Sequence, residues 1–217
     1  MEAQIEQLEQ RLSKIILFSK DEIKSASQRL NAALIGKFFG RGFPIDYVEK
    51  EMWICWNLQG EFHISAMSKG LMLFQCPSKE AKNQILAKGP WSLARQLLAL
   101  EPWGPKFRSG RDTINQLRVW FHLPDLPLEL WEECKILKIA SQVGVPMFLS
   151  EWTLNSSRLG YAWVCVLLDA LRPICPRVRI MIHDDVMWQQ FSYEELSNIY
   201  YNCGHIGVTL MPATVHP

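Results

Sequence analysis

Residues 33–103, which begin ALIGKFFG and end QLLALEPW, decide the fold. Both ends of this stretch are short apolar runs bounded by Gly or Pro, the pattern of buried strands. Between them, residues 61–67 alternate apolar and polar side chains, and residues 71–76 form another apolar run after the turn Ser68-Lys69-Gly70. These two runs predict a hairpin in the middle of the stretch.

Two helices are predicted, one on each side of the hairpin. The first opens at Pro44 and carries apolar side chains at helical spacing. The second follows Ser78, a residue type that caps helices, and stops at Gly89-Pro90. This order of elements predicts a ferredoxin-like βαββαβ (RRM-like) module over residues 31–103, called the first module below. It predicts an α+β fold for the chain.

The N-terminal residues 1–30 differ in kind from the rest of the chain. Apolar residues recur there at the spacing of a heptad, at Ile5, Leu8, Leu12 and Ile15. Glu and Gln fill the positions between them, so we expect an amphipathic helix. This helix either pairs with a second copy as a short coiled coil through residues 1–18 or folds onto its own domain.

After the first module we expect a basic linker at residues 104–116 and a second small α/β lobe at residues 117–195. The predicted elements of the lobe are strands at 117–123, 145–152 and 161–168, a helix at 128–143 and a hairpin at 177–193. The strand at 161–168 is a nearly continuous apolar run, so we expect it to be buried on both faces. The helix has a predicted buried stripe of Leu130, Trp131, Cys134, Leu137 and Ala140 or Ser141.

Charge and cysteine content exclude some classes of protein. The net charge of the 217-residue chain is only +1, so any basic surface must be local. The six cysteines lie mostly inside apolar runs without a Cys-x-x-Cys pair, which is typical of free thiols in a reducing compartment. The Glu- and Gln-rich N-terminus is unlike a secretory signal, and the longest apolar run is too short to span a bilayer. We therefore expect an intracellular protein, in the nucleus or the cytoplasm, without a membrane partner.

Catalytic motifs are absent from the sequence. It contains no GxSxG, no P-loop, no dinucleotide-binding Gly motif and no HExxH. The five histidines are far apart, and His63, His122 and His183 fall at predicted strand positions, where a hydrogen-bonded structural histidine is expected. We expect no enzymatic activity and no small-molecule substrate.

The third strand of the first module tests for an RNA-binding sheet. RNA-recognition motifs carry Lys or Arg, then Gly, then two aromatic residues that stack bases on this strand. Here Lys69-Gly70 is present, but the two outward positions hold Leu71 and Leu73. Aliphatic side chains offer no ring to a base. We therefore expect another element or a partner to cover this face.

Cations gather in the linker and just beyond it, at Lys106, Arg108, Arg111 and Arg118. Trp103 and Phe107 are interleaved with them. Flexible basic segments with aromatic residues can track a phosphate backbone. The alternative is an ordinary solvated linker.

The sequence contains four recognisable segments, here called phrases: ALIGKFFG, KGPWSLARQLLALEPW, LRVWFHLPDLPLELW and RLGYAWVCVLLD. Together they resemble the plant domain-of-unknown-function family that precedes a CCHC zinc knuckle, over residues from about Ala33 to about Gly207. Many members of that family are retrotransposon-derived and resemble the nucleic-acid-binding first open reading frame of plant LINE elements. The resemblance implies single-stranded nucleic-acid binding in a retroelement particle. The family often has Arg where this chain has Trp163, which weakens that implication.

The zinc knuckle of the family is degenerate in this chain. The pattern Cys-x-x-Cys-Gly-x-x-Gly-His-x-x-x-x-Cys would place its four ligands at Tyr200, Cys203, Val208 and Ala213. Cys203 is the one surviving ligand, and a structural zinc needs about four donors. We therefore expect no zinc and no other cofactor. The sequence ends soon after these residues, as expected of a decayed or domesticated fragment.

We expect a retrotransposon-derived nucleic-acid-binding protein that binds single-stranded RNA or DNA electrostatically and with low specificity. The candidate contacts are Lys37, Arg41, Lys69, Lys106, Arg108, Arg111, Arg118 and Arg158, the last from the RLGYAWVC phrase. One alternative is a protein-interaction or self-assembly module, built on the N-terminal heptads and the aliphatic face at Leu71 and Leu73. Another is a non-functional transposon remnant.

Overall fold

A computed structural model describes residues 4–5 and 15–196 of the chain. The chain divides into two compact units, Met1–Asn31 and Ala32–Pro217. The predicted N-terminal heptad lies largely outside the described residues, and so does the predicted knuckle remnant and tail at 196–217, apart from its first residue. In the described part of the chain, no helix is long and apolar enough to cross a membrane.

The first unit contains the helix α2 (Lys20–Arg29), whose start is fixed by a reciprocal cap. The backbone N–H of Glu22 donates to Ser19 Oγ at 3.2 Å, and the backbone N–H of Ser19 donates to Glu22 Oε2 at 2.7 Å. Such a capping box satisfies donors that would otherwise lack partners at the helix end. The hydrogen bonds from Ser19 lower the pKa of Glu22, because they favour its ionised form.

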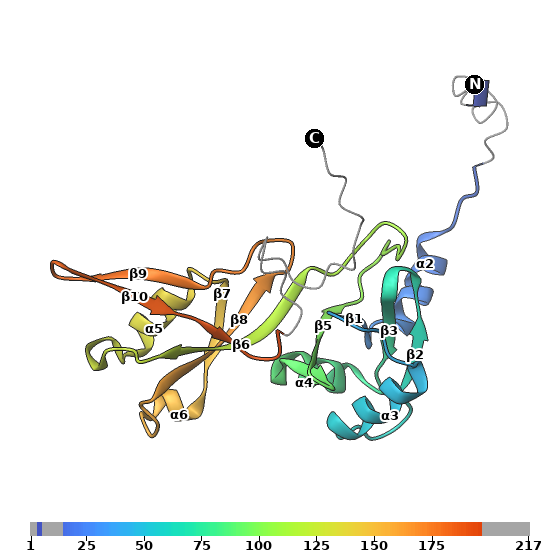
Figure 1. Cartoon of the computed structure of the whole chain (residues 1–217). Helices are drawn as coiled ribbons and strands as arrows, with labels where there is room; N and C mark the ends of the chain where they lie inside the picture. Colours follow the sequence, from blue (N-terminus) through green and yellow to red (C-terminus); the bar gives the residue numbers. More distant parts are fainter. Residues whose placement is uncertain (1–3, 6–14, 197–217) are drawn as a thin grey trace. The chain divides into compact units, whose positions relative to one another are not determined.

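The second unit begins with the first module, which confirms an α+β fold (Figure 1). Its elements are β1 (Ala33–Phe38), α3 (Ile45–Cys55), β2 (His63–Ala66), β3 (Leu71–Gln75), α4 (Lys79–Lys88), β4 (Trp91–Leu93) and β5 (Gln96–Pro102). The strand order is β2-β3-β1-β5-β4, and all neighbours are antiparallel. The short strand β4 was not predicted. The predicted cap is confirmed, since the backbone N–H of Ala81 donates to Ser78 Oγ at 3.1 Å.

One face of the first sheet packs against α3 and α4. Apolar side chains from alternate strand positions form this cluster with Val48 and Met52 of α3 and Ile85 of α4. The packing leaves no room for a side chain at Gly36 of β1. A Cβ atom there would lie 2.4 Å from Phe74 Cε2 and 2.9 Å from Leu100 Cδ2.

The second lobe follows in the same unit. Its elements are β6 (Gln116–Pro124), a 3₁₀ turn (Leu128–Leu130), α5 (Glu133–Ala140), β7 (Val145–Leu149), α6 (Glu151–Leu154), β8 (Tyr161–Asp169), β9 (Arg177–Ile182), β10 (Asp185–Gln190) and β11 (Ser192–Tyr193). The main sheet has the order β11-β6-β8-β7, while β9 and β10 form a separate two-stranded hairpin. The inner face of the main sheet is apolar, and side chains of α5 and of the hairpin pack on it.

The two sheets share one apolar core. Ile35, Leu71 and Leu97 of the first sheet belong to the same buried cluster as the inner face of the second sheet. Leu71 is only 2% exposed, and Ile114 of the predicted linker is also buried in this cluster. The prediction that another element covers the aliphatic face of the first module is therefore confirmed. Its cover is the chain's own second lobe.

Several local predictions for the second lobe were wrong. The helix expected at 128–143 begins only at Glu133, because Trp131 has a non-helical backbone (φ −82°, ψ 48°) after the 3₁₀ turn. Its buried residues are Ile136, Ile139 and Ala140, whereas Cys134 is exposed. The strand β8 is not buried on both faces, because the outer positions of Tyr161, Trp163 and Leu167 are open or partly open, although Cys165 is buried. His183 lies in the turn of the hairpin, with a φ of 52°, rather than in a strand.

We predict that Gly36→Ala destabilises the protein by about 1–3 kcal/mol, because the new methyl group must displace two packed side chains. Urea unfolding followed by tryptophan fluorescence measures this change. Gly42→Ala is the matched control, since a Cβ at Gly42 would meet nothing within 4 Å. Equal stability of the two variants would contradict the packing at Gly36.

Thiol reactivity tests the burial of two strands. Burial raises the pKa of Cys76 to about 11 and that of Cys165 to about 12, so little of either thiol ionises near neutral pH. With iodoacetamide at about pH 8, we expect Cys134, which is exposed, to be modified before Cys76 and Cys165. Peptide mass spectrometry over time measures the order of modification. Faster alkylation of Cys165 than of Cys134 would contradict the position of β8.

Candidate nucleic-acid interface

The outer face of the second sheet carries a cluster of aromatic rings. Because side chains alternate along a strand, Trp120 and His122 of β6 point away from the buried Val119 and Phe121. The antiparallel register places the β8 residue Trp163 opposite His122. We call this surface the aromatic face, comprising Trp120, His122, Phe148, Trp152, Tyr161 and Trp163.

The rings of the aromatic face contact one another in ordered pairs. His122 stacks on Tyr161 with ring centroids 4.6 Å apart and an interplanar angle of 20°. Trp152, from α6, stacks on Trp163 at 5.4 Å and 27°. Trp163 also contacts the rings of Trp120, His122 and Tyr161, so it lies at the centre of the cluster.

Hydrogen bonds fix the orientation of the central rings. Glu194 Oε1 accepts a hydrogen bond from Trp163 Nε1 at 3.1 Å and lies 2.9 Å from His122 Nε2. The backbone N–H of Trp163 donates to Thr153 Oγ1 at 2.8 Å. Glu194 therefore links the chain beyond β11 to both β6 and β8. The expectation of a hydrogen-bonded histidine is confirmed for His122.

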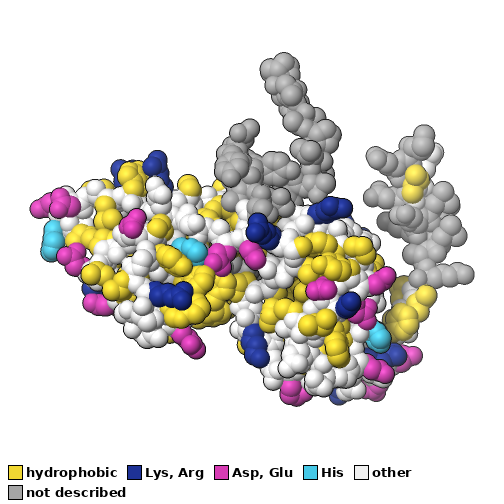
Figure 2. Space-filling view, turned by 60° about the horizontal axis from the view of Figure 1, so that its bottom comes forward, with side chains coloured by type: hydrophobic (Ala, Val, Ile, Leu, Met, Phe, Trp, Pro, Cys, Tyr) yellow, Lys and Arg dark blue, Asp and Glu magenta, His cyan; other side chains and the backbone are white. Residues whose placement is uncertain are grey.

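Two rings of the face are open to solvent. Trp152 is 45% exposed and Tyr161 is 38% exposed. The guanidinium carbon of Arg158 lies 4.6 Å from the centroid of the Trp152 ring, which is a cation–π contact. Figure 2 shows hydrophobic side chains gathered on the surface of the second lobe, with charged side chains among them. Exposed rings beside a cation offer π surface and positive charge to a ligand.

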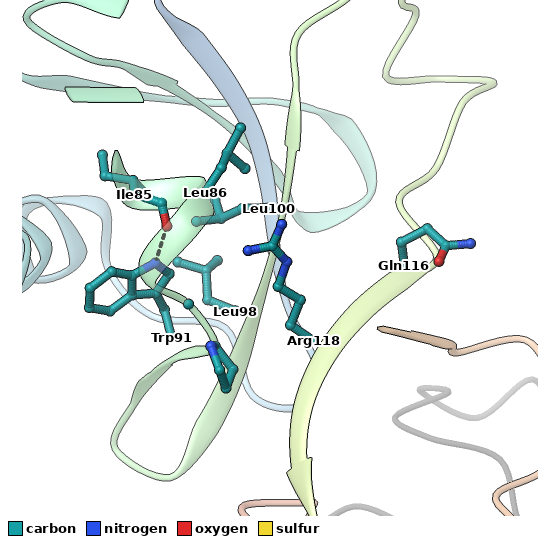
Figure 3. Close-up of a pocket in the computed structure, with 9 residues that line it drawn as sticks. Ile85, Leu86, Trp91, Leu98, Leu100, Gln116 and Arg118 are labelled. Atoms are coloured by element: carbon teal, nitrogen blue, oxygen red, sulfur yellow. Dashed lines mark hydrogen bonds between the residues drawn. The ribbon is translucent and has the colours of Figure 1, made fainter. Parts of the chain in front are cut away.

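Arg118 lies on the same side of β6 as Trp120 and His122. Its side chain extends from β6 toward Leu100 of the first module (Figure 3). There it borders a small crevice of about 20 Å³, whose wall includes Trp91. The indole N–H of Trp91 is held by Ile85 O at 2.7 Å. Of the eight predicted contacts, Arg118 and Arg158 are those found on the side of the sheet that carries the aromatic face.

The remaining predicted cations lie elsewhere. Lys37 and Lys69 line one cleft of about 770 Å³ in the second unit, and Lys37 Nζ lies 5.8 Å from the Phe39 ring centroid. Arg41 is exposed in the loop after β1. Lys106, Arg108 and Arg111 are exposed in the turns before β6, where the backbone N–H of Arg108 donates to Asp112 Oδ2 at 2.6 Å. The eight cations therefore do not form one continuous basic groove.

The aromatic face was not predicted as a site from the sequence. The alternation along residues 117–123 placed Trp120 and His122 on one face, which was a usable signal. Residues 161–168 gave no such signal, because apolar residues occupy both faces of that strand. Within the described residues there is no group of three or more His, Cys, Asp or Glu side chains suited to a metal ion.

Comparison with known proteins identifies one family in the chain. Residues 26–111 match the family described as Domain of unknown function (DUF4283). This match covers the first module and most of the linker, and it ends before the strands of the aromatic face. No curated protein matches the chain.

We predict that Glu194→Ala destabilises the protein by about 1 kcal/mol, because Trp163 Nε1 and His122 Nε2 lose their hydrogen-bond partner. Both side chains of the His122–Glu194 pair are partly buried, so water replaces the lost contacts only in part. Urea unfolding measures the change. Glu129→Ala is the control, since the side chain of Glu129 forms no hydrogen bond among the described residues. Unchanged stability of Glu194→Ala would show that Glu194 does not fix the aromatic rings.

Proposed function

We propose that this chain is a non-catalytic protein that binds single-stranded RNA or DNA with low sequence specificity. The observation that supports it is the aromatic face, with Arg118 and Arg158 on the same side of the sheet. The inner face of the same strands fills the core, so the exposed rings of Trp152 and Tyr161 lie outside the core. Sheet surfaces that combine aromatic rings and cations bind single strands by stacking bases and contacting phosphates.

Binding combines two kinds of contact, base stacking on aromatic rings and phosphate contacts with cations. Bases stack on the open rings, and each stacked base is worth roughly 1–3 kcal/mol. Phosphates contact Arg158, Arg118 and the exposed cations of the linker, which precede β6 directly in the chain. Neither contact reads a base edge, so binding is sequence-tolerant.

The origin of the chain belongs to the same proposal. Four phrases of the sequence resemble a plant family of which many members are retrotransposon-derived, and two of them, LRVWFHLPDLPLELW and RLGYAWVCVLLD, contain strands of the aromatic face. The match over residues 26–111 supports the resemblance for the two phrases that lie within it, ALIGKFFG and KGPWSLARQLLALEPW. We infer a retroelement-derived protein from plants whose binding surface lies outside its matched domain.

Self-assembly is the second candidate function. It no longer rests on Leu71 and Leu73, since the second lobe covers the face that carries them. It is favoured by the run Ile15-Ile16-Leu17-Phe18, in which every side chain is largely exposed within its own unit. Sedimentation analysis of a variant in which these residues are replaced by Ser tests this candidate.

Anisotropy of a labelled single-stranded RNA tests the role of the exposed rings. We predict that Trp152→Leu weakens binding roughly 5- to 150-fold, the equivalent of one stacked base. Trp53→Leu is the matched control, because Trp53 on α3 is also 45% exposed but lies in the first module. Equal affinity of the two variants would contradict stacking on the aromatic face. Absence of binding by the wild type would favour a non-functional remnant.

Salt dependence tests the role of the cations. We predict that replacing Lys106, Arg108, Arg111 and Arg118 together by Gln flattens the plot of log affinity against log salt by about 0.7 for each phosphate that the variant no longer neutralises. The same anisotropy assay, repeated across salt concentrations, measures the slope. An unchanged slope would exclude these four cations from the interface.

A further inference from the structure

The β9–β10 hairpin has a second surface that the aromatic face does not include. Its inner side chains Val178 and Ile180 pack on the shared core. Its outer side chains are exposed at alternate positions of both strands, at Arg177, Arg179, Met181, Val186, Trp188 and Gln190. We call these six residues the ribbon face. In Figure 1 the tip of the hairpin projects beyond the other strands of the lobe.

Two cations of the ribbon face lie close to one aromatic ring. The guanidinium carbon of Arg177 lies 4.2 Å from the Trp188 ring centroid, and that of Arg179 lies 5.2 Å from it. The antiparallel register places Trp188 directly opposite Arg179, with Arg177 as its diagonal neighbour. Trp188 nevertheless remains 50% exposed.

The ribbon face carries the positive charges of Arg177 and Arg179. Among the described carboxylates, none forms an ion pair with Arg177 or Arg179. The nearby Asp185 pairs with Ile182, which lies on the inner row of the hairpin. Two like charges beside one ring, with no ion-pair partner among the described carboxylates, complement an anionic ligand that also has a flat apolar part.

The ribbon face and the aromatic face lie on opposite sides of the second sheet. The hairpin packs on the inner face of this sheet, and its ribbon face points away from that core. The aromatic face is the outer surface of the same sheet. A short oligonucleotide therefore cannot contact both faces at once.

We propose that the ribbon face is a second, separate binding surface for single-stranded nucleic acid, with Arg177 and Arg179 holding phosphates and Trp188 stacking a base. This inference rests on the proposed function. Guanidinium groups form bidentate hydrogen bonds with phosphate oxygens, and a guanidinium that lies against a ring remains free to do so at its edge. A nucleotide of a second strand, or of a distant segment of one strand, provides the anionic phosphate and the flat base together.

Counting bound oligonucleotides tests the inference. The probe is a single-stranded RNA of about five nucleotides, near the lower limit of a single-strand site. Native mass spectrometry of the full chain should show two bound oligonucleotides for the wild type. It should show one for the Arg177→Gln, Arg179→Gln variant and one for the Trp152→Leu, Tyr161→Leu variant. Lys50→Gln, Lys79→Gln is the control, because it removes the same charge from α3 and α4 and should retain two.

The outcomes separate the inference from the function on which it rests. One bound oligonucleotide on the wild type, absent from the aromatic-face variant and kept by the ribbon variant, would overturn the ribbon site and leave the proposed function standing. No bound oligonucleotide on the wild type would overturn both. Polyglutamate bound through Arg177 and Arg179 in place of RNA would also overturn the inference, because the partner would then be an acidic protein.

Discussion

The pairing of β6 with β8 is the constraint on which the rest of the unit depends. These strands are in register from Gln116 opposite Asp169 to Pro124 opposite Tyr161. Every second side chain enters the core that the two sheets share, and the intervening row points outward. The inner row therefore joins the first module to the second lobe, while the outer row lies outside that core and carries aromatic rings and Arg118. Both the fold and the proposed interface follow from this one alternation.

The same core explains why a binding surface would lie in the second lobe. In the first module, the sheet face opposite the helices is aliphatic and packs against the second lobe, so Leu71 is almost fully buried. Among the described residues, the outer face of the second sheet is covered only in part, so aromatic side chains remain accessible there at Trp152 and Tyr161. Glu194 contacts both His122 and Trp163 and holds these two rings, on which Tyr161 and Trp152 stack, in fixed orientations. This lowers the entropic cost of ordering the aromatic face around a ligand.

Local patterns predicted most of the fold, and tertiary contacts explain what they missed. The α+β class, the Ser78 cap and the alternation of the β9–β10 hairpin all depend on residues close in sequence. The late start of α5 depends on the turn at Trp131. For the candidate site, the eight cations were chosen from local charge. Only the pairing of distant segments, such as Glu194 with Trp163, shows that Arg118 and Arg158 lie on the side of the aromatic rings. The alternation along residues 177–182 is visible in the sequence, but only the structure shows that Arg177 and Arg179 both lie near the ring of Trp188.

Ultraviolet cross-linking can locate a bound single strand on the outer face of the second sheet, where we propose that it lies. Single-stranded RNA is irradiated in complex with the wild-type chain, and the cross-linked peptides are identified by mass spectrometry. We expect cross-links at Trp152 and Tyr161, the open rings of the aromatic face. Cross-links confined to the first module, with none at these two residues, would contradict binding on this face.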